Sequence, residues 1–426
     1  MDARIQPSPL SGTVRVTPSK SQAHRALICA ALADKPTRVE CEVISKDIEA
    51  TAACLDMLGA EIHFIQGGYD IIPLKRDRLL CSYSLPCRES GSTFRFLLPI
   101  AAVLRQKTSF ILEGRLPKRP LSPLYEELVR HGCTLSPQGS VPITIAGELT
   151  PGGYSLNAGV SSQFISGLLF ALPLLDGDSV LQLSGRVESF PYIELTMSML
   201  EMFSVEVMFE DMVFSIPGGQ KYRSPGTVCV EGDWSNAAFW LSAGAMGVNG
   251  VTCTGLDMHS RQGDRAILDI LTQFGAKVEV NGSSVTVSGG ELRGIEIDVR
   301  DIPDLVPVLA VTASMAEGTS LIRNAGRLRD KESDRLAAMT DVLYKLGADI
   351  SETGDGLLIH GCKSLIGGWL SSWGDHRIAM AAAIAAVVCT EPVVIKGAEA
   401  VNKSYPGFFD DLLLLGGKVE LMKGGG

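Results

Sequence analysis

The chain lacks a long apolar stretch. Its longest hydrophobic runs, FISGLLFALPLL (164–175) and IAMAAAIAAVVC (378–389), hold about twelve residues each, whereas a helix that spans a bilayer needs about twenty. The opening residues, MDARIQPSPL, also lack the apolar core of a signal peptide. Both runs therefore predict buried helices, and we expect a cytoplasmic protein that does not bind a membrane.

Motifs for cofactors and metals are missing as well. The ten cysteines form no Cys-x-x-Cys pair, and the six histidines show no metal-ligand spacing. The sequence contains no P-loop, no dinucleotide fingerprint after a strand and no nucleophile elbow. These absences favour a group transfer between two small molecules, with no cofactor and no metal. The cysteines are expected to be buried thiols in a reducing compartment.

Basic residues are not in excess. The chain has 38 Lys and Arg against 48 Asp and Glu, a net charge of −10 and a pI near 5.2. An acidic chain repels nucleic acid in general, so we expect no nucleic-acid partner. An anionic ligand must then meet a local cluster of cations.

What the chain does contain is one pattern repeated six times. Each copy is an apolar helix pattern that ends at a small residue and is followed by a strand pattern. The small residues recur about every 71 residues, at Gly59, Gly132, Ser204, Gly275, Gly347 and Gly416. Glycine tolerates the left-handed conformation in which many helices end. Six such units predict two domains of three units each.

The expected fold class is α/β, with two domains built as inside-out α/β barrels of βαβ-containing units. The helix patterns ALICAAL (26–32), ISGLLFALPLL (165–175) and IAMAAAIAAVV (378–388) are apolar on every face, which predicts buried helices and outward-facing sheets. The stretch 217–236 is rich in Gly, Pro and polar residues, as a domain boundary would be. We expect a first domain at 20–228 and a second at 1–19 plus 229–426.

Several helix patterns open with hydroxyls or cations. These openings are SKSQAHR (19–25), ESGSTFR (89–95), SSQF (161–164), RLRDKESDR (327–335) and GDHR (374–377). A helix N-terminus is already positive, so added cations destabilise the empty protein. We interpret the five openings together as docking points for phosphate or carboxylate groups. Taken singly, each would also fit a solvated surface charge or a plain N-cap.

The cations are too many for one monoanion. They are Lys20, Arg25, Arg95, Arg119, Lys331, Arg335, Arg377 and Lys403. The set suits two phosphorylated or carboxylated small molecules bound side by side between the domains. Asp304 heads an apolar helix pattern, and Glu332 lies between two of the cations. Such carboxylates would stay ionised, which suits a base, but an N-cap or a salt bridge would explain them as well.

Eight motifs, in order along essentially the whole chain, resemble the enolpyruvyl transferase family. They are KSQAHR, ESGSTFR, SSQF, SFPYIELT, IPDL, KESDR, GDHR and NKSYPGFF. The resemblance is to the members that move the carboxyvinyl group of phosphoenolpyruvate to the 5-hydroxyl of shikimate 3-phosphate through a tetrahedral adduct, releasing phosphate, on the way to aromatic amino acids. It implies helix N-termini that point at a cleft between the two domains, small-molecule substrates and no metal. We expect a monomer.

The resemblance also implies the site residues by position. For shikimate 3-phosphate they are Lys20, Ser21, Arg25, Ser161, Ser162, Gln163, Ser189, Tyr192, Asp304 and Lys331. For phosphoenolpyruvate they are Lys20, Gly91, Arg119, Gln163, Arg335, Arg377 and Lys403, with Arg95 close by. Asp304 would take the 5-hydroxyl proton, and Glu332, with Lys20 nearby, would protonate the methylene carbon. The first domain would hold most of the shikimate 3-phosphate site.

Some positions depart from the family's pattern. Its best-known members read Asn-Ala-Gly-Thr-Ala-Met-Arg where this chain has ESGSTFR, so Glu89 adds a negative charge beside an anion site. Arg327 replaces an Asn that some members place beside shikimate 3-phosphate. The inhibitor glyphosate occupies the phosphoenolpyruvate place in the family; Gly91 is kept here, whereas Ser92 and Phe94 differ.

Two alternative functions stay open. The enzyme that loads enolpyruvate onto UDP-N-acetylglucosamine shares the implied fold, but it opens with Lys-Asn and uses a loop cysteine. This chain has Lys20-Ser21 instead, and no cysteine between 113 and 123. A non-catalytic ring of six repeats around nucleic acid would need cations along one face rather than at helix ends.

Overall fold

The computed structural model describes residues 1–75, 82–105 and 107–423. The chain forms two compact units: unit 1 comprises Met1–Thr17 and Glu231–Gly426, and unit 2 comprises Pro18–Val230. The chain therefore leaves unit 1 after its first strands and returns to it after completing unit 2. The sequence had suggested boundaries a few residues away, at 20 and 229.

Among the described residues, the strands form six four-stranded sheets of one design. Two strands pair in parallel, and two more follow in antiparallel order. In unit 2 the first sheet has the order β14 (Thr227–Cys229), β3 (Thr37–Glu40), β5 (Gly68–Ile72), β4 (Glu61–Ile65). The second has the order β6 (Ser82–Arg88), β7 (Lys107–Leu112), β9 (Ile143–Gly147), β8 (Cys133–Leu135). The third has the order β10 (Gly153–Asn157), β11 (Ser179–Ser184), β13 (Val213–Ile216), β12 (Met208–Glu210).

The sheets of unit 1 follow the same order. They are β2 (Gly12–Arg15), β15 (Val251–Thr254), β17 (Ser284–Ser288), β16 (Lys277–Asn281); β18 (Glu296–Asp298), β19 (Thr319–Arg323), β21 (Leu357–His360), β20 (Asp349–Glu352); and β22 (Gly368–Ser371), β23 (Val393–Lys396), β1 (Asp2–Gln6), β24 (Lys418–Met422). Parallel pairing joins strands far apart in sequence, as in the register of Val14 with Cys253 and of Val39 with Val228. In unit 1 the pairing of β2 with β15 joins the segment before unit 2 to the segment after it. In unit 2 the pairing of β3 with β14 joins the first strand of the unit to its last.

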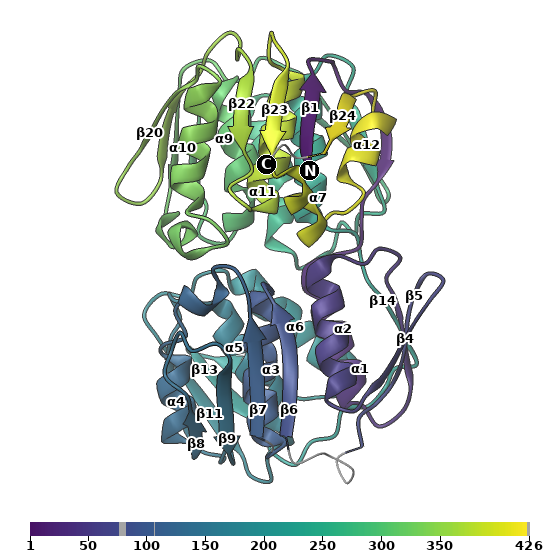
Figure 1. Cartoon of the computed structure of the whole chain (residues 1–426), viewed down its shortest axis with the longest axis vertical. Helices are drawn as coiled ribbons and strands as arrows, with labels where there is room; N and C mark the ends of the chain where they lie inside the picture. The colour runs from purple at the N-terminus through teal and green to yellow at the C-terminus, as the bar shows by residue number, and fades with distance from the viewer. Residues whose placement is uncertain (76–81, 106, 424–426) are drawn as a thin grey trace. The chain divides into compact units, whose positions relative to one another are not determined.

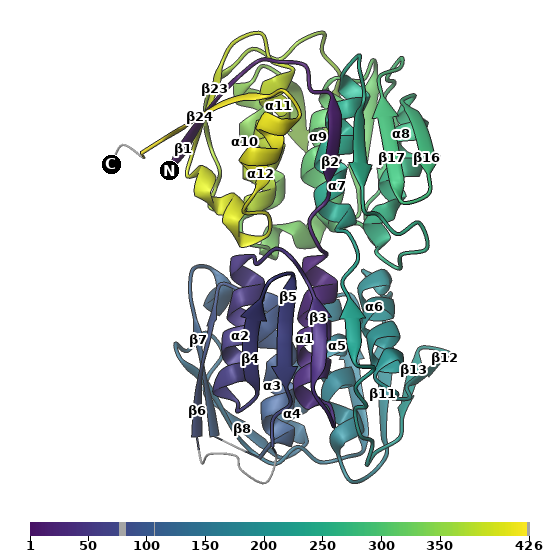
Figure 2. The same cartoon turned by 90° about the vertical axis from the view of Figure 1, so that its right-hand side faces the viewer.

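A buried helix accompanies each parallel pair. In unit 2 these helices are α1 (Lys20–Leu32), α3 (Gly91–Val103) and α5 (Ser162–Ala171), and in unit 1 they are α7 (Trp234–Met246), α9 (Val306–Ser314) and α11 (His376–Val387). Within unit 2, β6 and β7 lie over α3 in Figure 1, and β3, β5 and β4 lie over α1 and over α2 (Lys46–Met57) in Figure 2. The prediction of an α/β fold with helices inside and sheets outside is confirmed.

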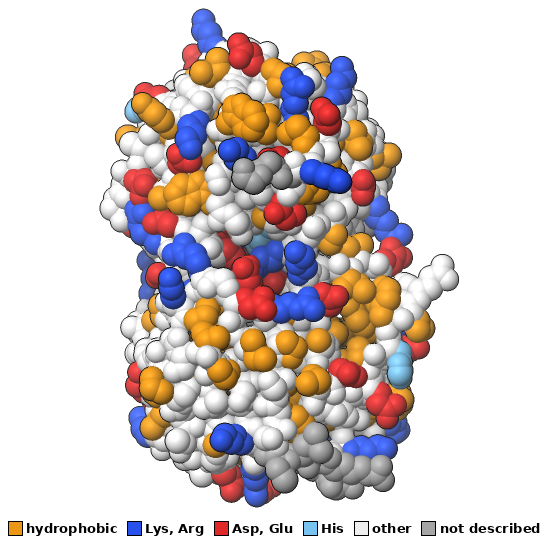
Figure 3. Space-filling view, viewed as in Figure 1, with side chains coloured by type: hydrophobic (Ala, Val, Ile, Leu, Met, Phe, Trp, Pro, Cys, Tyr) orange, Lys and Arg blue, Asp and Glu red, His pale blue; other side chains and the backbone are white. Residues whose placement is uncertain are grey.

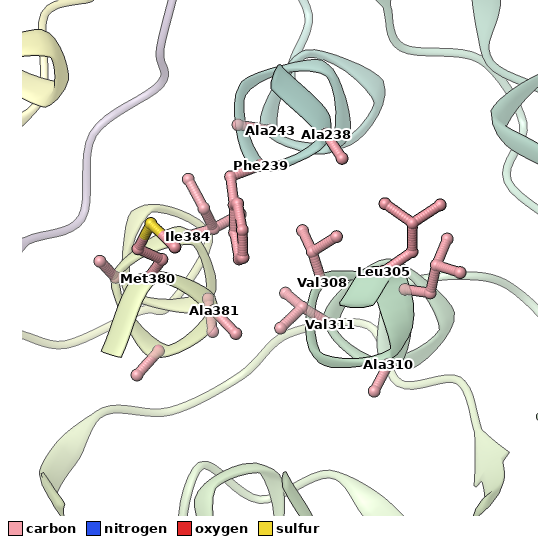
Figure 4. Packing of buried hydrophobic residues seen from close by; sticks show 14 of the residues in the cluster. Ala238, Phe239, Ala243, Leu305, Val308, Ala310, Val311, Met380, Ala381 and Ile384 are labelled. Carbon is pink, nitrogen blue, oxygen red and sulfur yellow. The ribbon is translucent and has the colours of Figure 1, made fainter. Parts of the chain in front are cut away.

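Small side chains let the buried helices pack closely. All twelve residues of α11 are buried, and six of them are alanine. Figure 4 shows Phe239 of α7 reaching between α9 and α11, where Val311 and Ile384 also point inward. Burying one such Val or Ile side chain stabilises a fold by about 1.5–3 kcal/mol. The helices that looked apolar on every face in the sequence therefore form the core.

A second helix in each repeat ends in the left-handed conformation. These helices are α2 (Lys46–Met57), α4 (Leu124–Arg130), α6 (Phe190–Met202), α8 (Ile267–Phe274), α10 (Arg335–Lys345) and α12 (Phe408–Leu414). The six small residues that follow have φ between +58° and +105°, at Gly59, Gly132, Ser204, Gly275, Gly347 and Gly416. The predicted helix stops are confirmed, and Ser204 adopts a conformation that costs a non-glycine residue about 1–2 kcal/mol.

The surface mixes residue types, and charged side chains of both signs lie among hydrophobic ones on the face shown in Figure 3. A membrane-spanning helix is not found in the described part of the chain. The cysteines that the structure describes are free thiols, and most are buried. The expectation of burial is wrong for Cys229, which is exposed, and for Cys362, which is half-buried, while Cys81 lies outside the described residues.

Candidate active site

Helix α1 begins with a cation that a carboxylate neutralises. Ser19 caps the helix by accepting a hydrogen bond from the Gln22 backbone N–H at 3.4 Å. The Lys20 ammonium lies 3.0 Å from the Asp47 carboxylate, in the first turn of α2. Asp47 was not singled out from the sequence; its signal is an acidic residue two positions after the Ser45 N-cap, where a helix favours negative charge.

Arg25, one turn further along α1, is buried among neutral oxygen atoms. Its guanidinium donates to the Thr196 hydroxyl at 2.8 Å, the Tyr192 carbonyl at 2.8 Å and the Ser21 carbonyl at 2.5 Å. Burial lowers the pKa of Arg25 to about 10, so the group stays protonated at neutral pH. A cation held by neutral partners keeps its attraction for an anionic ligand.

Glycine at position 91 leaves room for two guanidinium groups. An added Cβ there would lie 2.9 Å from the Arg95 Nη1 and 3.0 Å from the Arg119 Nη1. Arg95 donates to the Gln163 side-chain oxygen at 2.8 Å, and Gln163 donates to the Ser92 hydroxyl at 2.9 Å. The openings of α3 and α5 and the 116–119 turn thus bring a glycine, two arginines and a glutamine together. This is a suitable setting for a small anion.

The other predicted residues of unit 2 also lie at helix starts. Ser161 caps α5 and accepts from the Gln163 backbone N–H at 3.3 Å, and Ser162 is the first, buried residue of that helix. Ser189 precedes α6 with φ +56°, in the left-handed region that few non-glycine residues adopt. The carboxylate of Glu89 lies directly beside Gly114.

In unit 1, one arginine joins three carboxylates. The Arg335 side chain is 2% exposed and donates to Asp304 at 2.8 Å, to Asp375 at 2.8 Å and to Glu332 at 3.1 Å. Burial lowers the pKa of Arg335, but Asp375, Asp304 and Glu332 outweigh it, so the pKa lies above its usual value. The two candidate proton-transfer groups, Asp304 and Glu332, therefore share one guanidinium.

Asp304 also binds a second arginine. It lies in the short turn η5 (Pro303–Leu305) that leads into α9, and its second oxygen accepts from the Arg377 guanidinium at 3.0 Å. Its side chain is 21% exposed, whereas those of Arg335 and Arg377 are 2% and 4% exposed. Both salt-bridge and catalytic interpretations of Asp304 are therefore compatible with its position, since it is paired and still reachable.

Asp375 anchors this cluster from below the surface. It is fully buried, caps α11 by accepting from the Arg377 backbone N–H at 2.9 Å, and also accepts from the Ser333 hydroxyl at 3.1 Å. The sequence placed Asp375 at a helix opening but gave it no role. An aspartate directly before an apolar helix is the signal of an N-cap; its bonds to Arg335 depend on packing.

The opening of α10 differs from the prediction. The helix begins at Arg335, and the residues before it form a separate turn, η6 (Gly326–Asp330). Arg329 pairs with Asp334 and Glu352 on the surface, and Arg327 donates to the Arg300 carbonyl at 2.6 Å. The expectation that Arg327 and Arg329 open the helix is therefore wrong, because the chain turns once more before α10 starts.

The predicted site residues divide between the two units. Unit 2 carries Lys20, Ser21, Arg25, Gly91, Arg119, Ser161, Ser162, Gln163, Ser189 and Tyr192. Unit 1 carries Asp304, Lys331, Glu332, Arg335, Arg377 and Lys403, the last being buried at the end of η7 (Ala398–Lys403). Over the residues that the structure describes, no cluster of three His, Cys, Asp or Glu side chains is arranged to hold a metal ion.

Solved structures share this architecture. The structure of EPSP synthase from Acinetobacter baumannii superposes with a TM-score of 0.82 at 26% identity, over 99% of this chain and 100% of that one. The enolpyruvyl transferase NikO from Streptomyces tendae has a TM-score of 0.79 at 19% identity, with 98% of each chain covered. At that lower identity the second likeness shows the fold alone.

Sequence comparisons agree over nearly the full length. A chain named 3-phosphoshikimate 1-carboxyvinyltransferase from Clostridium kluyveri is 45% identical over 420 residues, covering 98% of this chain and 97% of the relative. Another of that name from Clostridium acetobutylicum is 44% identical over 423 residues, covering 98% of each. The family model for EPSP synthase (3-phosphoshikimate 1-carboxyvinyltransferase) matches residues 5–412. With its repeated fold and its cation-rich helix openings, the chain belongs to the EPSP synthase family.

Proposed function

We propose that this chain transfers the carboxyvinyl group of phosphoenolpyruvate to the 5-hydroxyl of shikimate 3-phosphate, releasing phosphate. The observation that carries the proposal is the Arg335 guanidinium, which binds the carboxylates of both Asp304 and Glu332 in a chain of this family. Two carboxylates held by one cation can divide the giving and taking of protons between them.

Shikimate 3-phosphate binds to hydroxyls, amides and cations at helix openings in this proposal. The residues are Lys20, Ser21, Arg25, Ser161, Ser162, Gln163, Ser189, Tyr192, Asp304 and Lys331. Support comes from Arg25, whose partners are neutral oxygens, and from Ser161, which caps a helix whose N-terminal N–H groups favour anions.

Phosphoenolpyruvate carries a phosphate and a carboxylate, and both need cations. We assign it to Lys20, Gly91, Arg119, Gln163, Arg335, Arg377 and Lys403, with Arg95 close by. Support comes from the arginines that flank Gly91 and from the near-complete burial of Arg335 and Arg377. Buried guanidinium groups hold carboxylates and phosphates in a fixed orientation, which brings the reacting atoms together.

The proton transfers follow from the chemistry of the substrates. Glu332 acts in its protonated form, with Lys20 nearby, and gives that proton to the methylene carbon of phosphoenolpyruvate, so that the adjacent carbon becomes positive. Asp304 takes the proton of the 5-hydroxyl as its oxygen attacks that carbon, which gives the tetrahedral adduct. The reverse proton movements expel phosphate and restore the double bond. Arginines that face the departing phosphate stabilise its charge as it develops.

We further propose that the chain works as a monomer in the cytoplasm, within aromatic amino-acid biosynthesis. The free thiols among the described cysteines support a reducing compartment. Its partners are the two small-molecule substrates. Size-exclusion chromatography with light scattering tests the monomer, because a dimer would double the measured mass.

A phosphate-release assay tests the function. We expect phosphate only when phosphoenolpyruvate and shikimate 3-phosphate are both present, and we expect the rate to persist with a metal chelator. Product mass should show addition of the carboxyvinyl group. Turnover with UDP-N-acetylglucosamine in place of shikimate 3-phosphate would instead assign the chain to the other enolpyruvyl transfer reaction.

A further inference from the structure

A buried hydrogen-bond chain runs from α1 to the opening of α3. The His24 Nδ1 lies 2.7 Å from the Thr51 hydroxyl of α2, which lies 2.6 Å from the Thr93 hydroxyl of α3. Thr93 donates from its hydroxyl to the Ser90 hydroxyl at 2.7 Å, and from its backbone N–H to the same atom at 3.3 Å. All four side chains are at most 1% exposed.

The position of each proton in this chain follows from counting. A hydroxyl has one proton to donate. Thr93 gives its proton to Ser90, so the Thr51–Thr93 bond must use the proton of Thr51. Thr51 then has none left for the imidazole, and His24 must donate from Nδ1–H. All the hydrogen bonds are therefore donated in one direction, from His24 toward Ser90. In such an arrangement successive hydrogen bonds strengthen one another.

The other ring nitrogen agrees with this tautomer. The Nε2 of His24 is buried and has no hydrogen-bond partner in the part of the chain that the structure describes. Burial lowers the pKa of His24 to about 3, more than Asp47 raises it, so the ring is neutral at physiological pH. Lys20 and Arg25 flank it and lower the pKa further. A neutral ring with a proton on Nδ1 carries a bare Nε2.

The hydrogen-bond chain ends next to the residues proposed to bind phosphoenolpyruvate. Ser90 is the N-cap of α3, and Gly91 is its first residue. A methyl group at Gly91 would come within 3.0 Å of the Arg95 and Arg119 guanidinium groups, so small shifts of this helix start change the space around them. The His24–Thr51 contact also lies one helical turn below the Lys20–Asp47 ion pair, on the same faces of α1 and α2.

We propose that His24 is a positioning residue for phosphoenolpyruvate: as a neutral Nδ1–H donor, it orders Thr51, Thr93 and Ser90 so that α3 starts with Gly91 and Arg95 in place. The identity of the ligand in this inference rests on the proposed function, whereas the hydrogen bonds from His24 to Ser90 do not depend on it. His24 does not touch the substrate; it acts through the three hydroxyls.

Nitrogen-15 NMR of histidine-labelled protein tests the proton assignment without any substrate. We expect one pair of ring-nitrogen resonances that disappears in His24→Asn and so belongs to His24. Its shifts should show the proton on Nδ1 and an unprotonated Nε2, and they should not change between pH 5 and 8. A proton on Nε2 would overturn the inference. Because this readout needs no turnover, it separates the inference from the proposed function, which fails if the wild type does not convert the two substrates.

Kinetics test the positioning role. His24→Asn keeps an amide donor near the Nδ1 position, and His24→Leu has a similar size but no donor. We expect His24→Leu to raise KM for phosphoenolpyruvate by about three- to tenfold, the loss expected for one hydrogen bond. KM for shikimate 3-phosphate should change less than about twofold, and His24→Asn should stay near wild type. Equal effects of the two variants, or parallel shifts of both KM values, would overturn the role.

A double-mutant cycle shows whether the effect travels along the chain. Thr93→Val removes the donor to Ser90, so adding His24→Leu to it should raise KM no further; additive effects would contradict the inference. Thr51→Val breaks the chain in the middle and replaces His24→Leu if that variant does not fold. Tyr222→Phe is the matched control, because Tyr222 donates to the Phe170 carbonyl in the same unit, outside this chain. It should lower stability and leave both KM values unchanged.

Discussion

Units 1 and 2 have the same sheet design and the same buried helices, but they hold their buried cations differently. In unit 2, Arg25 is bound by a hydroxyl and two carbonyls, and the nearby His24 is neutral. In unit 1, Arg335 and Arg377 are bound by carboxylates. Within unit 2, Lys20 is paired with Asp47, whereas Arg25 keeps a charge that only neutral oxygens surround. In unit 1, the buried arginines are held by carboxylates, and two of these are the groups proposed to exchange protons.

The difference teaches how one fold serves two tasks. A cation among neutral oxygens attracts an anion without competition. A cation among carboxylates is partly neutralised, and an anionic ligand must share it with Asp304 and Glu332. Under the proposed function, that sharing brings the proposed acid and base to the ligand that Arg335 binds. In the proposed function, Arg25 of unit 2 therefore serves binding alone, whereas Arg335 of unit 1 both binds a substrate and holds the two carboxylates proposed to transfer protons.

The largest expected effect compares a carboxylate of each unit. Asp304→Asn keeps the shape of the side chain and removes the proposed base, so we expect kcat to fall by about 10²- to 10⁴-fold. Asp47→Asn removes only a partner of Lys20, and its effect should be about tenfold or less. Initial rates of phosphate release measure both, and the exposed Asp349→Asn in unit 1 is the control. Equal losses at Asp304 and Asp47 would remove the proposed distinction between the units.

The second comparison concerns stability. Arg335→Met leaves the buried Asp375 without its main cation, and such a loss costs about 3–5 kcal/mol. Arg25→Met leaves only neutral oxygens unpaired, at about 1–3 kcal/mol. All four tryptophans, Trp234, Trp240, Trp369 and Trp373, belong to unit 1, so their fluorescence follows unit 1 in denaturant. Hydrogen exchange follows unit 2. A larger loss for Arg25→Met would contradict the comparison.

The two units should respond to pH in opposite directions. In unit 1, burial and then Asp304 raise the pKa of Asp264 from 3.8 to about 7, more than Arg377 lowers it. The folded unit then holds a proton between pH 4 and 7 that the unfolded chain releases. This contribution to stability is complete below pH 4 and is lost as pH rises through 7, by up to about 1.4 kcal/mol per pH unit.

His24 in unit 2 gives the opposite trend. Its pKa falls from 6.5 to about 3 on folding, so the unfolded chain binds a proton that the folded unit excludes. Its contribution is present above pH 6.5 and is lost as pH falls through 3. Urea unfolding at several pH values, followed by tryptophan fluorescence and by hydrogen exchange, measures the two trends. Asp264→Asn should reduce the pH dependence of the free energy of unfolding in unit 1 alone, and His24→Asn should reduce it in unit 2 alone. An unchanged pH dependence in either variant would show that another group is responsible.

The smallest expected effect concerns space at a helix start. Gly91→Ala places a methyl group against the ends of Arg95 and Arg119, which can shift aside. We expect KM for phosphoenolpyruvate to rise about tenfold, because one hydrogen bond to a charged group weakens. Stability should stay near wild type. Gly153→Ala is the matched control in unit 2, since nothing lies within 4 Å of its added Cβ. An unchanged KM in Gly91→Ala would exclude this role.

Sequence reasoning found the repeats and the helix openings but not their partners. The six left-handed stops were readable because the residue at each must tolerate positive φ, and five are glycine. The sequence shows Lys20 as a cation at a helix N-terminus, where a positive charge is unfavourable. It does not indicate that Asp47 is the partner of Lys20, because the two are 27 residues apart. Arg327 and Arg329 lie in η6 and not in α10, and the sequence alone does not show this because a polar turn before a helix has the same composition as the helix start.

The sequence by itself determined the α/β class, the sixfold repeat, the buried helices and the cations at their openings. These features are encoded locally, in apolar periodicity and in the backbone conformation that each residue tolerates. Only the tertiary structure decided that Arg335 meets Asp304 and Asp375, which lie 31 and 40 residues away, and that His24 Nδ1 lies against the Thr51 hydroxyl. Such pairings depend on how buried helices pack, because burial penalises every polar group that lacks a partner and so selects the partners that fit.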